Sequence, residues 1–501
     1  MVQIDQTVEQ PSESRALPSE RYVMRTMSPV LGTFDMIAIY LAAILFIGNA
    51  GPTAAFGGVV SLTYLLIGAV TFFLPCVFAA AQLGALFPYE GSLYNWTSRA
   101  LGNNWGFFAG VSYWLPNVLA IIAAADGFVT YIQGLNNNWL TLPWQQGLVI
   151  LLVIAFTAIL GCYRLRTTQN VVNAGIVLTL GVVALVGLAC YIFLVQHGSA
   201  TPFNKPGDWA TNGQNFPLFG LIALLYLGVS VPLNMGGEIR ERTGVPRRKV
   251  VTRHLLWGTI LVLAGYFLCT FALLVVRGPA MANDPIVPYE VVVLIQSVFG
   301  KFIGAVSAVC ILSFYLIAPL VYNYSTARLL LVGGIDQRIP TFLGRLNKHR
   351  VPANAVIFQS IVAGGICALL FFIIPAIASV EKSVNLATGV YNVVLAAMTL
   401  ILALSTIFYF VDLFAVYRRD KRAFHRQRIC PMWILWASMF VGPIACLVVV
   451  VDTLQNSWIP QLIPNSQWWY LVGSLAFASI AITAIGTMYA SSQAEWEALS
   501  R

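Results

Sequence analysis

Two short segments, Gly48-Asn49-Ala50-Gly51-Pro52 and Gly228-Val229-Ser230-Val231-Pro232, interrupt two membrane-length apolar stretches of this 501-residue chain. They start 180 residues apart, and each begins with glycine and ends with proline. A helix broken at membrane depth frees backbone N–H and C=O groups, which must face protein, water or a ligand. Matched breaks in corresponding segments of two halves are typical of the binding site of a secondary transporter. The alternative is a chance spacing of two residues that are common in membrane helices.

The composition excludes a soluble protein. Hydrophobic residues make up 58% of the chain and charged residues only 9%, whereas soluble domains carry about 25% charged residues. We therefore predict an all-α polytopic membrane protein with twelve transmembrane helices, since each crossing needs about 20 apolar residues. The predicted spans are 31–56, 59–84, 105–131, 144–162, 169–195, 215–239, 253–277, 301–331, 353–375, 384–411, 432–452 and 468–490. A further short helix is expected over Ser92–Leu101, at the membrane surface.

The distribution of lysine and arginine predicts the orientation. If the N-terminus is cytoplasmic, 23 of the 28 basic residues fall in inner segments, four fall in outer loops, and Arg328 lies within span 8. This is the positive-inside pattern, so we expect a cell-membrane protein with both termini in the cytoplasm. The net charge of +9 follows this topology, and we expect a lipid bilayer and no nucleic acid as partner.

The cysteines and histidines give no sign of a cofactor. The eight cysteines are scattered, six of them within apolar segments, and no CxxC pair or Cys/His cluster occurs. We interpret them as small buried hydrophobic residues, with neither disulfides nor metal ligands among them. We therefore predict no cofactor, and a coupling ion, H⁺ or Na⁺, is left open.

Four stretches carry a family resemblance in the expected order along the chain. They are Gly48-Asn49-Ala50-Gly51; Phe87-Pro88-Tyr89-Glu90-Gly91-Ser92-Leu93-Tyr94-Asn95-Trp96; Tyr226-Leu227-Gly228 with Gly236-Gly237-Glu238; and Ser325-Thr326-Ala327-Arg328-Leu329-Leu330. Together they resemble the amino acid–polyamine–organocation (APC) superfamily, specifically its amino-acid permeases, from about Thr33 to Tyr489. Two departures stand out. The usual Gly-x-Gly of the first stretch has an extra residue, and Ser92 replaces a glycine in the second.

The resemblance implies a five-plus-five inverted repeat with discontinuous helices 1 and 6. Helices 1–5 would occupy residues 28–195 and helices 6–10 residues 196–411, with accessory helices 11 and 12 in 412–490. A disordered cytoplasmic N-terminus (1–27) and a cytoplasmic tail (491–501) would flank them. The offset of the two breaks is separate evidence for such a repeat.

The breaks predict how an amino acid would be held. We expect helix 1 to stop near Gly48 and restart near Pro52–Thr53, so that N–H groups of Ala50, Gly51 and Thr53 bind the substrate carboxylate. Helix 6 would end near Leu227–Gly228, where its free carbonyls would hold the α-ammonium.

Several side chains near the breaks are candidates with two readings each. Asn49, Ser230 and Asn234 would bind substrate or satisfy freed backbone groups. The other candidates, on spans 3, 6 and 8, are Tyr113, Asn117, Tyr226 and Tyr322. They would form gates or pocket walls, or they would be ordinary core residues.

Charges within the spans suggest further roles. Asp126 on span 3 has no nearby basic residue in sequence, so it would bind a cationic group, carry a coupling proton, gate the outer vestibule, or lie solvated at the interface. Glu238 and Arg328 are expected to form an ion pair at the inner ends of spans 6 and 8. Many members of the superfamily have a lysine in the middle of span 5, where Thr179 stands here. Proton coupling through that lysine is therefore in doubt.

These observations favour a transporter over two other classes. No HExxH motif, paired carboxylates or Ser/His/Asp set suggests a membrane-embedded enzyme, and no repeated filter motif suggests a channel. We predict a secondary transporter of amino acids working by alternating access, as a monomer or homodimer. The alternative is a transporter of polyamines or other organic amines anchored by Asp126.

Overall fold

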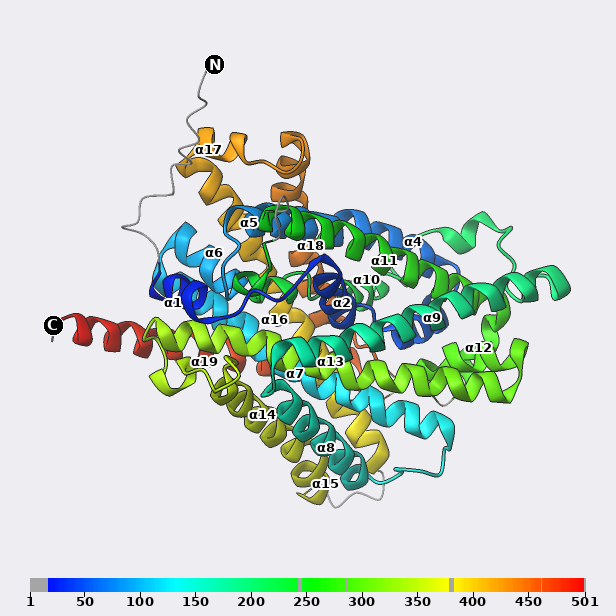
Figure 1. The fold of residues 1–501 in the computed structure, drawn as a ribbon. Coiled ribbons are helices and arrows are strands. Elements are labelled where there is room, and N and C mark those ends of the chain that lie inside the picture. The colour runs from blue at the N-terminus through cyan, green and yellow to red at the C-terminus, as the bar shows by residue number, and fades with distance from the viewer. Residues whose placement is uncertain (1–16, 242–245, 285, 378–382, 461, 500–501) are drawn as a thin grey trace.

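The computed structural model describes residues 17–241, 246–284, 286–377, 383–460 and 462–499, and this part of the chain is almost entirely helical (Figure 1). The longer helices run alongside one another in a single bundle. The α-helices are α1 (Pro18–Thr26), α2 (Thr33–Ile44), α3 (Ala50–Gly57), α4 (Val60–Gly68), α5 (Leu74–Leu86), α6 (Ser92–Leu101), α7 (Asn103–Leu135), α8 (Pro143–Gly161), α9 (Leu165–His197), α10 (Leu218–Leu225), α11 (Arg247–Val276), α12 (Glu290–Phe299), α13 (Lys301–Ile335), α14 (Ala353–Ala368), α15 (Ile374–Ile377), α16 (Ser383–Arg419), α17 (Lys421–Arg426), α18 (Met432–Gln455) and α19 (Asn465–Leu499).

Within the described residues, 11 helical stretches are long and apolar enough to cross a membrane. The predicted span that does not reach this length is 215–239. There the α-helix α10 has only eight residues and is followed by non-helical chain and by two 3₁₀ turns, Pro232–Asn234 and Gly236–Glu238. Helix α10 ends at Leu225, Gly228 then adopts φ +106°, which is not a helical conformation, and only a 3₁₀ turn begins at Pro232. The count of twelve crossings and the inverted repeat therefore stay predictions.

The first break lies earlier than the sequence predicted. Helix α2 ends at Ile44 and α3 begins at Ala50, so the chain leaves the α-helix at Leu45–Phe46 and forms a 3₁₀ turn over Ile47–Asn49. The prediction of an end near Gly48 and a restart near Pro52 was wrong. Glycine and proline show where a helix tolerates a break, but side chains from other helices stabilise the break four residues upstream.

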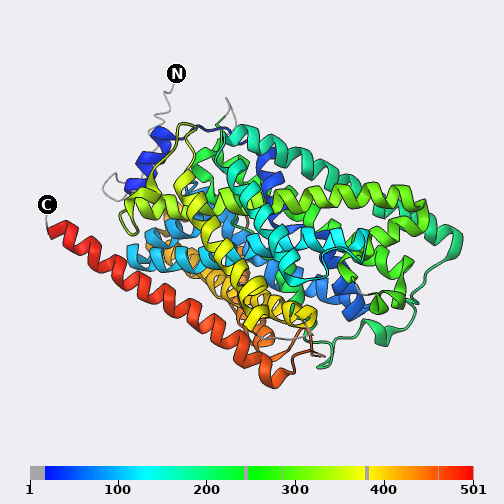
Figure 2. The ribbon, with the colours of Figure 1, turned by 90° about the horizontal axis from the view of Figure 1, so that it is seen from below.

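Helix α7 lies at the centre of the bundle and packs against both α13 and α16. By contrast, α19 runs along the edge of the bundle (Figure 2). Only 22% of the residues in its most apolar 18-residue stretch are buried. Helix α1 and the C-terminal end of α19 lie at the same end of the molecule in both views (Figures 1 and 2).

The two terminal segments, predicted to be cytoplasmic, contain more helix than the sequence indicated. Of the predicted disordered segment 1–27, residues 1–16 lie outside the described residues, but Pro18–Thr26 form α1, and Ser19, Glu20 and Val23 are buried. Most of the predicted tail, as far as Leu499, continues α19. The predicted short helix Ser92–Leu101 is confirmed as α6.

Candidate functional site

Tyrosine hydroxyls occupy the freed backbone groups of the first break. The Tyr266 hydroxyl donates to the Ile44 carbonyl at 2.6 Å and accepts the Phe46 N–H at 3.1 Å. The Tyr322 hydroxyl donates to the Ala43 carbonyl at 2.7 Å. Both tyrosines are buried. Their hydroxyls therefore provide the hydrogen-bond partners that water provides for exposed backbone groups.

The second break leaves its backbone groups open. Neither the carbonyls of residues 225–227 nor the N–H groups of residues 228–230 have a hydrogen-bond partner in the described structure. All six residues are buried. Because buried backbone groups are almost always paired with protein, water or a ligand, these three acceptors and three donors are available to water or to a ligand.

The two breaks meet inside the bundle. A Cβ atom added at Gly228 would lie 3.3 Å from the Ala43 carbonyl oxygen and 3.7 Å from the Tyr322 hydroxyl. Only glycine fits here, because the space is filled and φ is positive. The open groups of the second break therefore adjoin the last turn of α2.

Polar side chains line the neighbouring surface. The Tyr409 hydroxyl donates to the Ser230 hydroxyl at 2.6 Å, and the Tyr113 ring is 1% exposed with a hydroxyl that has no hydrogen-bond partner within the described residues. Tyr226 stacks on Phe73 with ring centroids 4.7 Å apart, and its hydroxyl bonds the Leu65 carbonyl, so Tyr226 forms a wall.

One side of the breaks, the outer side in the predicted orientation, is closed by the loop segment around Val287 and Pro288 and by an aromatic cluster. A Cβ atom at Gly51 would lie 2.3 Å from the Val287 carbonyl oxygen, and one at Gly48 would lie 2.6 Å from the Tyr315 hydroxyl. The Tyr131 hydroxyl donates to the Pro288 carbonyl at 2.9 Å. The start of α3 is thus covered by carbonyl oxygens, which would repel a carboxylate placed there in this conformation.

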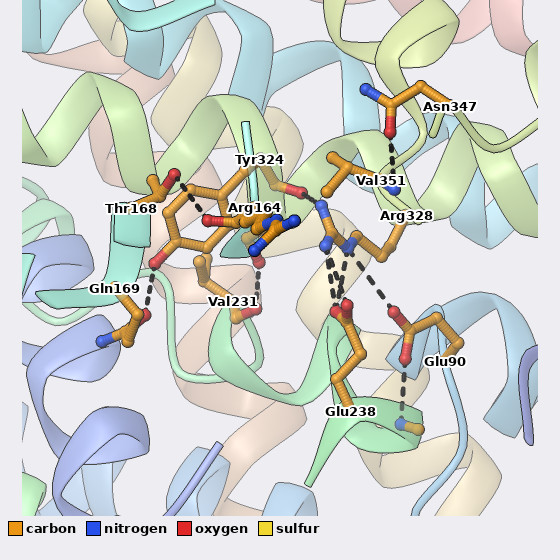
Figure 3. A network of polar contacts seen from close by, with 12 residues as sticks. Glu90, Arg164, Thr168, Gln169, Val231, Glu238, Tyr324, Arg328, Asn347 and Val351 are labelled. Carbon is orange, nitrogen blue, oxygen red and sulfur yellow. Dashed lines mark hydrogen bonds and ion pairs between the residues drawn. The ribbon is translucent and has the colours of Figure 1, made fainter. Parts of the chain in front are cut away.

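The inner side is closed by buried charges (Figure 3). Arg328 on α13 pairs with Glu238 at 3.0 Å and lies 3.5 Å from Glu90, which precedes α6. The ion pair predicted between Glu238 and Arg328 is confirmed. Leu31 and Ile239 form a backbone bridge beside it, so the chain before α2 is fastened to the inner half of the broken sixth span.

The predicted site residues fall into three groups. Gly228, Ser230, Tyr113, Leu227, Tyr226 and Tyr322 surround the second break. Gly48, Asn49, Ala50, Gly51 and Thr53 belong to the first turns after the first break, where Thr53 donates to the Asn49 carbonyl at 2.9 Å. Asn117 and Thr179 use their side chains within their own helices, on the Tyr113 and Gly175 carbonyls.

Asp126 stands apart from the breaks on the outer half of α7. Its carboxylate forms no hydrogen bond or ion pair with the described residues, and it lies within electrostatic reach of Tyr315 and Cys367. The neighbouring Gly127 packs directly on the Tyr315 ring, whose hydroxyl reaches Gly48. Asp126 is therefore linked to the first break through one tyrosine.

Sequence reasoning missed Tyr266, Tyr409, Tyr315 and Glu90. Each is an ordinary residue of its own segment and gains its role from a partner 90 or more residues away. The one signal in the sequence was the presence of tyrosines within the apolar spans. A buried tyrosine hydroxyl usually has a hydrogen-bond partner, so these tyrosines indicated polar contacts between helices.

The fold defines a multi-pass membrane protein in which two helix breaks lie next to each other, an arrangement typical of secondary transporters. Comparison with known proteins agrees. The family described as Amino acid permease matches residues 31–472, and the chain belongs to it. Membership of this family points to a transporter rather than an enzyme.

Individual relatives are similar over most of their lengths. An uncharacterized transporter of Legionella pneumophila is 23% identical over 87% of this chain and 92% of its own. A branched-chain amino acid permease of Lactococcus lactis is 25% identical over 67% of this chain and 74% of its own. A lysine-specific permease of Escherichia coli is 22% identical over 73% of each chain.

Proposed function

We propose that this protein moves amino acids across the cell membrane by alternating access, with the substrate backbone held at the second break. The observation that carries the proposal is the row of open carbonyls at 225–227 followed by open N–H groups at 228–230. An α-ammonium group is a donor and an α-carboxylate an acceptor. A zwitterion therefore complements both halves of the row without any ionised side chain.

The two broken helices share the task in this proposal. The carbonyl end of α10 carries the negative end of the helix dipole and attracts the ammonium. The start of α3 carries the positive end and attracts the carboxylate, once the loop carbonyls of Val287 and Pro288 have withdrawn from Gly51 and Gly48. Withdrawal of this loop is the outward opening, and separation of the inner charges is the inward opening.

In this proposal the residues that line the site determine which substrate side chain is accepted. Two of the relatives described above are named for branched-chain amino acids and for lysine, and these substrates differ in their side chains. Tyr113, Tyr226 and Tyr409 form a mainly aromatic wall here, which favours an uncharged side chain.

The test uses substrate derivatives, since the recognising groups are backbone atoms. Thermal stabilisation of the purified protein should identify amino acids that bind, because a ligand of the folded state raises its apparent stability. The amide and the N-acetyl derivative of each hit should bind about tenfold or more weakly, since each loses a charged hydrogen-bonding group. Equal binding of the derivatives would overturn the proposal.

The second candidate is a transporter of organic amines, and Asp126 favours it. A carboxylate without a partner, on a span and beside the Tyr315 cluster, suits a cationic group. In that case diamines would stabilise the protein, the Asp126→Asn variant would lose the effect, and zwitterionic amino acids would have none.

A further inference from the structure

Three ionisable side chains are buried together at the inner end of the bundle, and we call them the inner triad: Glu90, Glu238 and Arg328 (Figure 3). Their side chains are 1%, 3% and 0% exposed. They come from the segment before α6, from the inner half of the broken sixth span, and from α13. Opening the inner side requires these three elements to separate.

The charges of the inner triad do not balance. One guanidinium faces two carboxyl groups, so the fully ionised triad would hold one uncompensated negative charge away from water. Such a charge costs several kcal/mol, and a carboxyl group in this position takes up a proton instead. Two carboxyl groups that share one site cannot both ionise easily.

The hydrogen bonds show that Arg328 binds Glu238 more closely than Glu90, whose Oε1 atom is 3.5 Å from the Arg328 Nε atom. Glu238 accepts three hydrogen bonds from Arg328, at 3.2, 3.2 and 3.0 Å. The Oε2 atom of Glu90 accepts the Gly237 N–H at 2.9 Å, while its Oε1 atom has no hydrogen-bond partner in the described residues. Burial, and then the neighbouring Glu238, raise the pKa of Glu90 well above its usual value.

The surrounding charged groups do not supply the missing positive charge. On the neighbouring elements, Glu20 is paired with Arg99 and Asp35 with Arg166. Asp336 at the end of α13 accepts hydrogen bonds from Ser19 and Tyr94, and burial raises the pKa of Asp336 as well. The remaining group in contact is Tyr324, whose carbonyl accepts from Arg328 at 2.5 Å.

We propose that Glu90 and Glu238 bind one proton between them in the closed state, and that this proton leaves to the cytoplasmic side when the inner end opens. The proton balances the charge of the triad: Glu90 carries it on Oε1, the oxygen without a hydrogen-bond partner in the described residues, and Glu238 stays ionised and paired with Arg328. On opening, water reaches both carboxyl groups, the O–H bond of Glu90 breaks and the proton passes to solvent. The binding of the proton does not depend on the proposed function. Only the assignment of its release to a step of the transport cycle rests on that function.

The pH dependence follows from the raised pKa of Glu90. The closed state binds one proton more than the open state between the ordinary carboxyl pKa and the raised one. Closure is therefore favoured in full below the ordinary pKa and is weakened as the pH rises through this window. The open fraction should increase about tenfold per pH unit, because one proton is released.

Infrared spectroscopy of the purified protein tests for the proton without any substrate. In difference spectra at neutral pH, one component of the carbonyl-stretch band of protonated carboxyl groups should be lost in Glu90→Gln and in Glu238→Gln relative to the wild type. The control is Glu20→Gln, because Glu20 is buried but has its own arginine, so its replacement should leave the band unchanged. A band of unchanged intensity in both triad variants would show that the triad is anionic and overturn the proposal.

Hydrogen–deuterium exchange of residues 236–239 tests the coupling to opening. Protection of the Gly237 amide should fall in the wild type as the pH rises, after correction for intrinsic exchange rates. In Glu90→Gln the neutral amide carbonyl still accepts this N–H, so protection should be independent of pH. The same pH dependence in both proteins would overturn the coupling. Failure of amino acids to bind in the thermal assay would affect only the proposed function.

Discussion

At the scale of single residues, the two helix breaks differ in how their free backbone groups are hydrogen-bonded. The first break is closed by Tyr266 and Tyr322, whose hydroxyls take the place of water on buried carbonyls. The second keeps its groups open beside Gly228. We infer that the tyrosines hold the first break in shape so that only the second depends on a ligand.

Removal of one hydroxyl should show how much the first break depends on it. In Tyr266→Phe, the Ile44 carbonyl and the Phe46 N–H keep their mutual hydrogen bond of 2.9 Å but each loses its bond to the Tyr266 hydroxyl, and we expect the free energy of unfolding to fall by about 1 kcal/mol. Thermal unfolding in detergent measures the change. Tyr113→Phe is the matched control, since the Tyr113 hydroxyl has no partner in the described residues; equal losses in the two variants would contradict the role of Tyr266.

At the scale of elements, the N-terminal helix α1 fastens the inner end. Glu20 pairs with Arg99 on α6 and accepts the Asn95 amide at 2.6 Å. Ser19 bonds Asp336 at the end of α13 through both its N–H and its hydroxyl. Sequence alone predicted disorder here, because nine polar-rich residues show little apolar pattern and their partners lie on other elements.

Loss of the Glu20 carboxylate should loosen this end. In Glu20→Ala, the Arg99 guanidinium and the Asn95 amide lose their acceptor, and we expect a loss of about 3 kcal/mol in unfolding free energy. Glu241→Ala is the control, because Glu241 pairs with Arg247 at 3.3 Å but is 65% exposed and such pairs contribute under about 1 kcal/mol. Similar melting temperatures for both variants would show that α1 does not fasten the inner end.

The contact between α3 and the outer loop is also open to a direct test. Gly51→Ala would put a methyl group 2.3 Å from the Val287 carbonyl oxygen, so the loop must move, at a cost of about 1–3 kcal/mol. We expect slower counterflow in proteoliposomes and a lower melting temperature. Gly365→Ala is the control, because nothing lies within 4 Å of its added Cβ and alanine favours the helix. An unimpaired Gly51→Ala protein would show that the loop does not close the site.

At the scale of the whole molecule, the sequence predicts what depends on composition and misses what depends on contacts. Span positions follow from apolar length, and the Arg328–Glu238 pair follows from the rarity of intramembrane charge. The predicted position of the first break was wrong because the break is stabilised by Tyr266, which is 220 residues from Phe46 in the sequence. Glu90 was missed because it lies in a loop segment and becomes buried only when the sixth span packs on it.

The orientation of the whole molecule remains a prediction from basic residues, and it determines on which side the inner triad loses its proton. Single cysteines at two exposed positions test it: Asp208→Cys between α9 and α10, and Lys421→Cys at the start of α17. A membrane-impermeant maleimide added to intact cells should label the first and not the second, with the wild type giving the background of its eight free cysteines. Labelling of Lys421→Cys alone would invert the molecule, and the proton of Glu90 would then leave to the outside. The same result would place the Val287–Pro288 loop on the cytoplasmic face, so one experiment assigns both closures of the transport site to their compartments.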